Sequence, residues 1–173
     1  MKRFSAGVFL LVICTASAVA SDLPARKAGL WQLSTTTTDG HTFAMKQCVD
    51  AQTDQIMQSR FAGVSQRKCS KHDVQKSGDT ITIDSVCTIA GRTTSGHTVI
   101  TGSFDSGYTM TITSQIQGLP APRTVKTAVK WLGPCAAGQK PGDVIMSNGM
   151  TMNILDPQKG MSGGRGAPMA PHQ

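Results

Sequence analysis

Hydrolytic chemistry is the first possibility that residue types and spacing raise in this chain. If the segment between Cys69 and Cys87 folds as a hairpin centred on Gly78, His72 and Asp84 face each other on neighbouring strands. A histidine that is oriented by a carboxylate forms half of a hydrolytic triad. The pair would lie on the solvent-facing side of the hairpin, however, where an exposed ion pair is the simpler interpretation. The expected β domain, residues 21–157, contains neither Gly-x-Ser-x-Gly nor a paired-carboxylate motif that would support catalysis. We therefore expect no enzyme, and a hydrolase that uses these two residues is the alternative.

Soft-metal binding is a second possibility, because methionines gather late in the chain. They are Met146, Met150, Met152, Met161 and Met169, with His172 close behind. Thioethers are soft ligands that suit Cu(I). Two of these methionines also alternate as the packing residues of a short strand would. Copper binding is therefore an alternative, and the main interpretation includes no metal and no cofactor.

Large apolar side chains at alternating positions could line a cavity for a small apolar or amphipathic ligand, since binding sites are usually concave and mostly apolar. The candidates are Trp31, Phe43, Met45, Tyr108, Met110 and Trp131. The same side chains could also form the packed core that a small β domain needs. The favoured function is a binding or structural module of the cell envelope, with a small apolar or amphipathic molecule as its ligand.

Gly29 and Trp31 form a Gly-x-Trp at the head of the first expected strand. The pattern resembles the one that opens lipocalin barrels, whose Trp fills the closed end and can stack under a basic residue late in the chain. In a small β domain, the same Trp can simply anchor the first strand. We expect Trp31 to be such a core anchor.

Two basic stretches could face an anionic envelope polymer or a lipid headgroup. They consist of Arg67, Lys68 and Lys71 and of Arg123, Lys126 and Lys130. A single-stranded nucleic acid platform needs aromatic side chains for stacking, and the whole chain has one Tyr and two Trp. We therefore expect no nucleic acid partner.

The composition favours β structure. All ten acidic residues are Asp, which favours turns and caps, and the sequence has no Glu, a good helix former. Alternating apolar residues indicate about seven strands, and a short hairpin around Asn148 and Gly149 follows them. One short helix is expected after the second strand, in the segment 50–63, with Asp50 as its cap. The predicted fold is mainly β: an antiparallel meander that forms a curled sheet or a partly open barrel, with two disulfides.

The two ends of the chain are expected to lie outside the folded domain. Residues 1–20 begin with Met-Lys-Arg, continue with a short apolar run and end in Ala-Val-Ala, which is the order of a secretory signal peptide. Residues 158–173 are rich in Gly, Pro and Met and are expected to be disordered. Residues 21–157 then form a single β domain of a periplasmic or secreted protein that does not span the membrane.

Removal of the signal peptide takes Cys14 with it and leaves an even number of cysteines, which in an exported protein implies two disulfides. These cysteines are Cys48, Cys69, Cys87 and Cys135. Cys69 and Cys87 lie at equal distances from Gly78 and would be opposed in a hairpin, at a separation compatible with a disulfide. This pairing leaves the other two cysteines for the second disulfide. A two-residue loop would put Cys69 and Cys87 one position out of line, and a bulge would then have to restore their register.

Several segments together resemble one bacterial exported family. They are LPARKAGLWQ (23–32), KQCVD (46–50), GSFDSGYTM (102–110) and KWLGPC (130–135) leading into KPGD (140–143), together with the paired Cys69 and Cys87. In this order and spacing they are similar to the domain-of-unknown-function family thirty-six-seventeen, from about Leu23 to Ile154. The resemblance implies an exported bacterial protein with a mostly β fold and disulfides. It implies no activity and no catalytic residue.

Overall fold

The computed structural model describes residues 23–62 and 68–156 of the chain. Within these residues, nine strands form one antiparallel sheet, and a helix follows the second strand. The strands are β1 (Gly29–Thr37), β2 (Thr42–Val49), β3 (Lys68–Ser77), β4 (Thr80–Ile89), β5 (Arg92–Ser103), β6 (Gly107–Ile116), β7 (Arg123–Gly133), β8 (Asp143–Met146) and β9 (Thr151–Asn153), and the helix is α1 (Ala51–Ala62).

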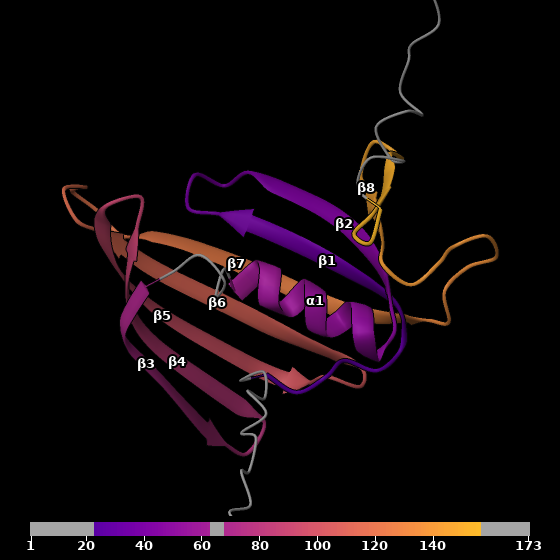
Figure 1. Cartoon of the computed structure of the whole chain (residues 1–173), viewed down its shortest axis with the longest axis horizontal. Helices are drawn as coiled ribbons and strands as arrows, with labels where there is room; N and C mark the ends of the chain where they lie inside the picture. The colour runs from indigo at the N-terminus through magenta and orange to yellow at the C-terminus, as the bar shows by residue number, and fades with distance from the viewer. Residues whose placement is uncertain (1–22, 63–67, 157–173) are drawn as a thin grey trace, which may run out of the picture.

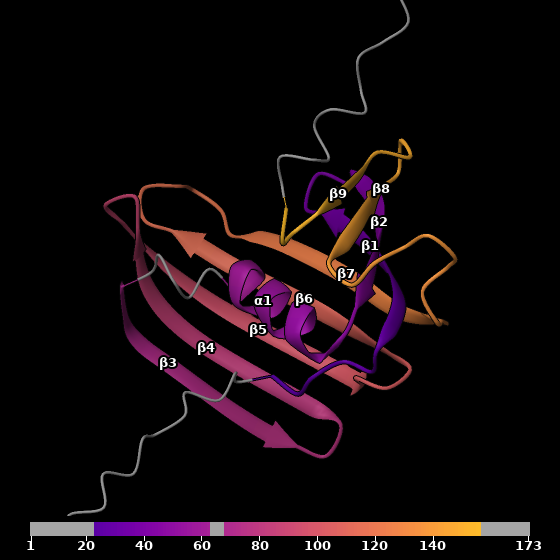
Figure 2. The ribbon, with the colours of Figure 1, turned by 45° about the vertical axis from the view of Figure 1, so that its right-hand side comes forward.

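The sheet is open and curled. β3 to β7 follow one another as a meander, β1 and β2 continue the sheet beside β7, and β8 and β9 complete it. β3 and β9 are the edges, so the sheet does not close. It curls around α1, which lies across one of its faces (Figures 1 and 2). The predicted mainly β antiparallel fold with one inserted helix is confirmed, and its nine strands are the seven long ones expected plus the two of the short hairpin.

The β3–β4 hairpin contains the bulge that the cysteine positions require. Its two-residue turn, Gly78-Asp79, sets the register of the hairpin near the turn. In that register Cys69 and Cys87 would not lie opposite each other but would be one position out of line. A register shift between Cys69 and Lys71 leaves one extra residue in β3 and brings Cys69 opposite Cys87. The disulfide between these two cysteines therefore depends on the bulge.

The same register shows that the predicted pair of His72 and Asp84 is wrong. His72 lies opposite Ser85, whereas Asp84 lies opposite Asp73 on β3 and His97 on β5. Because neighbouring positions on a strand point to opposite faces, His72 and Asp84 lie on opposite faces of the sheet. The prediction assumed one register for the whole hairpin, and the bulge confines that register to the cysteine pair and the neighbouring pair of Lys68 and Thr88. These two residues cannot act together in hydrolysis.

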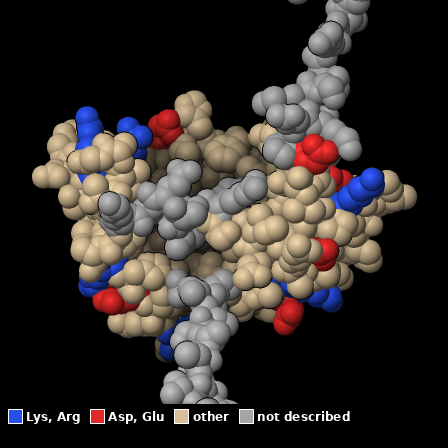
Figure 3. All heavy atoms as spheres, in the orientation of Figure 1, with Lys and Arg blue, Asp and Glu red and all other residues tan. Residues whose placement is uncertain are grey.

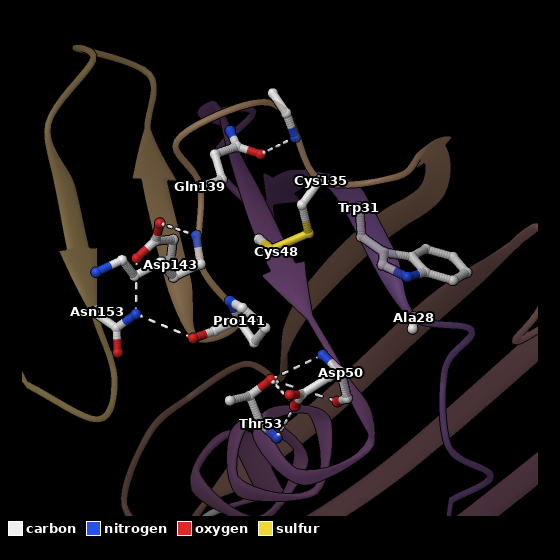
Figure 4. Close-up of a disulfide and its surroundings, with 12 residues drawn as sticks. Ala28, Trp31, Cys48, Asp50, Thr53, Cys135, Gln139, Pro141, Asp143 and Asn153 are labelled. Atoms are coloured by element: carbon white, nitrogen blue, oxygen red, sulfur yellow. Dashed lines mark hydrogen bonds between the residues drawn. A yellow bond between two sulfur atoms is a disulfide. The ribbon is translucent and has the colours of Figure 1, made fainter.

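Two disulfides join the cysteines in the expected pairs. One joins Cys69 to Cys87, and the other joins Cys48 at the end of β2 to Cys135 just after β7, with 5.5 Å between the Cα atoms of the second pair. Figure 4 shows the second disulfide close to the segment that leads into β8, where the N–H of Gly142 donates to the Cys48 carbonyl (2.8 Å). Disulfides are typical of proteins that fold in an oxidising compartment, as an exported protein does.

α1 begins at a capping box. The N–H of Thr53 donates to Asp50 Oδ1 (2.8 Å), and the N–H of Asp50 donates to Thr53 Oγ1 (3.0 Å), as Figure 4 shows. The hydrogen bonds from Thr53 stabilise the charged carboxylate and hold the pKa of Asp50 below its usual value. Asp50 is therefore the helix cap that the sequence predicts.

The core lies between α1 and the middle of the sheet. Its buried members are Trp31, Val49, Met57, Val129 and Val144. Met57 comes from α1 and the others come from four adjacent strands, β7, β1, β2 and β8, so the core joins the helix to this part of the sheet. Trp31 is fully buried, which confirms it as the core anchor of the first strand.

Gly29 allows the first strand to approach β7 closely. Its φ is +135°, and an added Cβ would overlap the Gly133 carbonyl oxygen and Trp131 Nε1. We expect Gly29→Ala to lower the free energy of unfolding by about 1–3 kcal/mol, because it adds steric overlap to backbone strain. Gly40→Ala is the matched control, since Gly40 also has a positive φ (+82°) but has open space at its Cβ position. Urea denaturation should show the smaller loss for the control; equal losses would contradict a role for close approach.

The predicted ends of the chain, a signal peptide over 1–20 and a disordered tail over 158–173, lie outside the described residues. In the described part of the chain, no helix combines the length and the apolar character needed to cross a bilayer.

Candidate binding face

One face of the sheet packs against α1, and we call it the inner face; the opposite one is the outer face. Paired residues on antiparallel strands share a face, so Trp31 on β1 shares the inner face with Gln47 on β2 and Trp131 on β7. The same rule places all six predicted lining residues on the inner face. They are Trp31, Phe43, Met45, Tyr108, Met110 and Trp131.

These six side chains differ in their burial. Trp31 is fully buried in the core, whereas Phe43 is 45% exposed. The other four are half-buried, and three of them pack against the core. Trp31 is therefore a packing residue, and the lining of a ligand site by the others stays a prediction.

Trp31 is covered by the segment that precedes β1. Its Nε1 donates to the Lys27 carbonyl (2.8 Å), and the guanidinium carbon of Arg26 lies 5.7 Å from the centre of its ring. Tyr108 approaches it from β6, with 6.2 Å between the ring centres. The basic residue over Trp31 thus comes from the start of the chain, and not from a late position as in the lipocalin pattern.

A buried ion pair joins this segment to α1. Arg26 Nε donates to Asp54 Oδ1 (2.6 Å), and the backbone N–H of Arg26 donates to Asp54 Oδ2 (2.8 Å). Gln58 Nε2 also donates to Asp54 Oδ2 (2.8 Å). The side chains of Arg26 and Asp54 are only 4% and 0% exposed. Both charged groups are buried away from water, so each depends on the other for its stabilisation.

The Tyr108 phenol lies beside this ion pair. Burial raises the pKa of Tyr108; the Arg26 guanidinium acts in the opposite direction, and the Asp54 carboxylate raises it further. The phenol therefore stays neutral at physiological pH, and it adds a hydrogen-bonding group beside the apolar core.

Sequence reasoning missed this ion pair, although one signal for it was present. Asp54 lies three residues before Met57 and so shares the helix face that enters the core. A carboxylate on the buried face of a helix needs a partner of opposite charge. The partner, Arg26, is 28 residues away in the sequence, and no local pattern identifies it.

Two buried amide oxygens near the inner face have no donor among the described residues. They are Oε1 of Gln47 on β2 and Oε1 of Gln58 on α1. The Nε2 of Gln58 is already used by Asp54 and by the Pro24 carbonyl (3.0 Å). Buried acceptors are normally paired with protein groups or with ordered water.

Beyond the core, apolar side chains continue across the inner face from β3 to β7. One row of half-buried residues, which we call the apolar row, consists of Val74, Ile83, Thr98, Ile112 and Val125. The neighbouring row contains Ile81 and Ile100, which are 6% and 1% exposed. Figure 3 shows this side of the molecule hollowed, with charged side chains toward its rim. The inner face thus offers a concave apolar surface next to the polar cluster at Tyr108.

The outer face carries a different polar site. His97 Nδ1 and Asp84 Oδ1 are 2.7 Å apart, and the hydrogen bond with His97 lowers the pKa of Asp84. The two side chains are 52% and 39% exposed and border an open groove of about 310 Å³ with Lys71, Thr113 and Gln115. An exposed pair across two strands is typical of a solvated sheet surface. His97 is therefore the partner of Asp84 that the sequence analysis assigned to His72.

The predicted basic residues are spread over both faces. Those exposed on the outer face are Lys71, Lys126 and Lys130. Arg123 is exposed on the inner face at the start of β7. Arg67 and the side chain of Lys68 lie outside the described residues. That these residues bind an anionic envelope component stays a prediction.

Some of the late methionines lie among the described residues, and the others lie outside them. Met146, Met150 and Met152 lie on the β8–β9 hairpin. Those outside the described residues are Met161 and Met169, with His172. Among the described residues, no group of three or more His, Cys, Asp or Glu side chains could hold a metal ion.

A family model described as a protein of unknown function (DUF3617) matches residues 26–135. The match begins at Arg26 of the buried ion pair and ends at Cys135 of the long-range disulfide, so it spans β1 to β7 and α1. No curated protein and no solved structure matches the chain.

Proposed function

The chain belongs to the DUF3617 family, and we propose that it is an exported, non-catalytic binding module that holds a small amphipathic ligand on the inner face of its sheet. The observation that carries the proposal is the concave apolar surface of β3 to β7 beside the neutral phenol of Tyr108. Ligand sites combine such surfaces with a few convergent polar groups.

The apolar part of the ligand would lie along β6 and its neighbours. Tyr108, Met110 and Ile112 are alternate residues of β6 and share the inner face. Four residues of a strand span about 13 Å, which is comparable to the length of an extended short acyl chain. Ile83 on β4 lies two strands away from Ile112 in the same apolar row and widens this surface.

The polar part of the ligand would lie toward α1. The phenol of Tyr108 can donate a hydrogen bond, and its oxygen already has the Arg26 guanidinium as a partner. The charges of Arg26 and Asp54 are already engaged with each other. A hydroxyl, amide or protonated acid therefore suits this end of the site better than a full charge.

Binding of N-phenyl-1-naphthylamine, a fluorescent apolar probe, tests the proposal on the mature, disulfide-bonded chain. We expect Ile83→Thr/Ile112→Thr to weaken binding at least tenfold, because each change removes roughly 0.8 kcal/mol or more of apolar contact and 1.4 kcal/mol is a factor of ten. The matched control is Val86→Thr/Val99→Thr, which alters half-buried residues of β4 and β5 on the outer face. The control should change the affinity less than twofold.

Equal weakening by both double variants would contradict binding on the inner face. Native mass spectrometry of the chain purified from the periplasm provides a second measurement. A retained mass of several hundred daltons supports the proposal. A clean unliganded mass, together with no binding of the probe, would overturn it.

A further inference from the structure

The β8–β9 hairpin brings late methionines next to one from the start of the chain. Met146 on β8 lies directly opposite Met45 on β2. On the other side of β8, the N–H of Met146 donates to the Met150 carbonyl (2.8 Å), one pair beyond Ile145 and Thr151. Met45, Met146 and Met150 therefore form a row across three neighbouring segments, which we call the methionine row.

All three side chains of the methionine row lie on the inner face, because opposed residues of antiparallel strands share a face. Opposed residues have their Cβ atoms about 4.5–5.5 Å apart. A methionine side chain has three rotatable bonds, so neighbouring thioethers in such a row can converge on one point. Met152 lies on the same face opposite Val144 and extends the group.

The methionine row begins where the core ends. Val144 is 8% exposed and belongs to the core, whereas Met146, two residues later on the same face, is 37% exposed. Met150 and Met152 are 49% and 39% exposed. These three side chains are exposed to solvent. Met45 is half-buried and packs against the core, and its Sδ accepts a hydrogen bond from Gln47 Nε2 (3.8 Å).

We propose that Met45, Met146 and Met150 form a binding site for Cu(I). Neutral thioethers are soft ligands, and they select Cu(I) over harder divalent cations such as Zn²⁺. Cys48, Cys69, Cys87 and Cys135 are all held in disulfides, so no thiolate of the domain competes for the metal. The site lies on β2, β8 and β9, apart from the apolar row on β3 to β7, and it stands independently of the proposed amphipathic ligand.

The test is an anaerobic Cu(I) titration of the mature, disulfide-bonded chain in competition with the chromophoric chelator bicinchoninate, with ascorbate to keep the copper reduced. We expect one Cu(I) to bind per chain. Met146→Leu and Met150→Leu should each lower the affinity at least tenfold. Leucine keeps the apolar character and nearly the volume of methionine, so the fold, checked by circular dichroism, should not change.

Two control variants locate the site. Met110→Leu alters a half-buried methionine of the inner face on β6, far along the sheet from β8, and should leave Cu(I) affinity unchanged. Met161→Leu/Met169→Leu should also leave it unchanged. If that double variant abolished binding while Met146→Leu did not, the methionine row would be excluded as the site. Failure of the unaltered chain to take Cu(I) from the chelator, or competition by Zn²⁺, would also overturn the proposal.

Discussion

Asp54→Asn in the disulfide-bonded chain is expected to lower the free energy of unfolding by about 3–5 kcal/mol. The reason is that removing one partner of a buried ion pair leaves the other charge without compensation. Arg26 would keep its guanidinium in a position where its side chain is 4% exposed, and asparagine cannot supply the negative charge. Urea denaturation followed by tryptophan fluorescence measures the loss, and Trp31 lies directly beneath Arg26.

Two further variants show whether the loss comes from the buried charge. Asp105→Asn changes an exposed aspartate in the turn before β6 and should alter stability by no more than about 0.5 kcal/mol. Arg26→Met/Asp54→Leu removes both charges and should be more stable than Asp54→Asn alone, since replacing a whole buried pair by apolar groups is often close to neutral. A double variant less stable than the single one would show that packing, and not charge, accounts for the effect.

The fold could be predicted from the sequence because its signals are local. Alternating apolar residues mark each strand, and Asp50 with Thr53 marks the start of the helix. The pairing of Cys69 with Cys87 followed from a single hairpin, and the bulge needed to align them is present. The same bulge makes the predicted pairing of His72 with Asp84 wrong, because the register on one side of a bulge does not extend to the other side.

The candidate sites could be predicted only in part, because they depend on which strands lie side by side. Placing six large side chains on one face required only the alternation within each strand. The β1–β2 hairpin brings Arg26 and Asp54 to the same end of the sheet. The approach of Met45 to Met146 depends in addition on β8 lying beside β2. Nothing local in the sequence specifies that order.

Removal of the long-range disulfide by Cys48→Ala/Cys135→Ala should cost more stability than removal of the short one by Cys69→Ala/Cys87→Ala. The sequence separations are 87 and 18. The loop-entropy relation gives about 4.6 kcal/mol for the longer loop and about 3.2 kcal/mol for the shorter one at 25 °C, since a longer cross-linked loop restricts the unfolded chain more. Urea denaturation of the two double variants, beside the unaltered chain, measures both losses.

A comparison of the two variants also tests the source of the stabilisation. Removal of the short disulfide could lower the free energy of unfolding as much as removal of the long one. Restriction of the unfolded chain would then not be the main source of stabilisation, and contacts in the folded state would have to account for it. The long disulfide has such contacts, because Cys48 is fully buried and its carbonyl accepts the N–H of Gly142 ahead of β8. Hydrogen exchange separates the two sources: if folded-state contacts matter, the Gly142 amide should exchange faster in Cys48→Ala/Cys135→Ala than global stability predicts. An unchanged pattern would leave loop entropy as the explanation, with the β8–β9 hairpin held by its own pairing to β2.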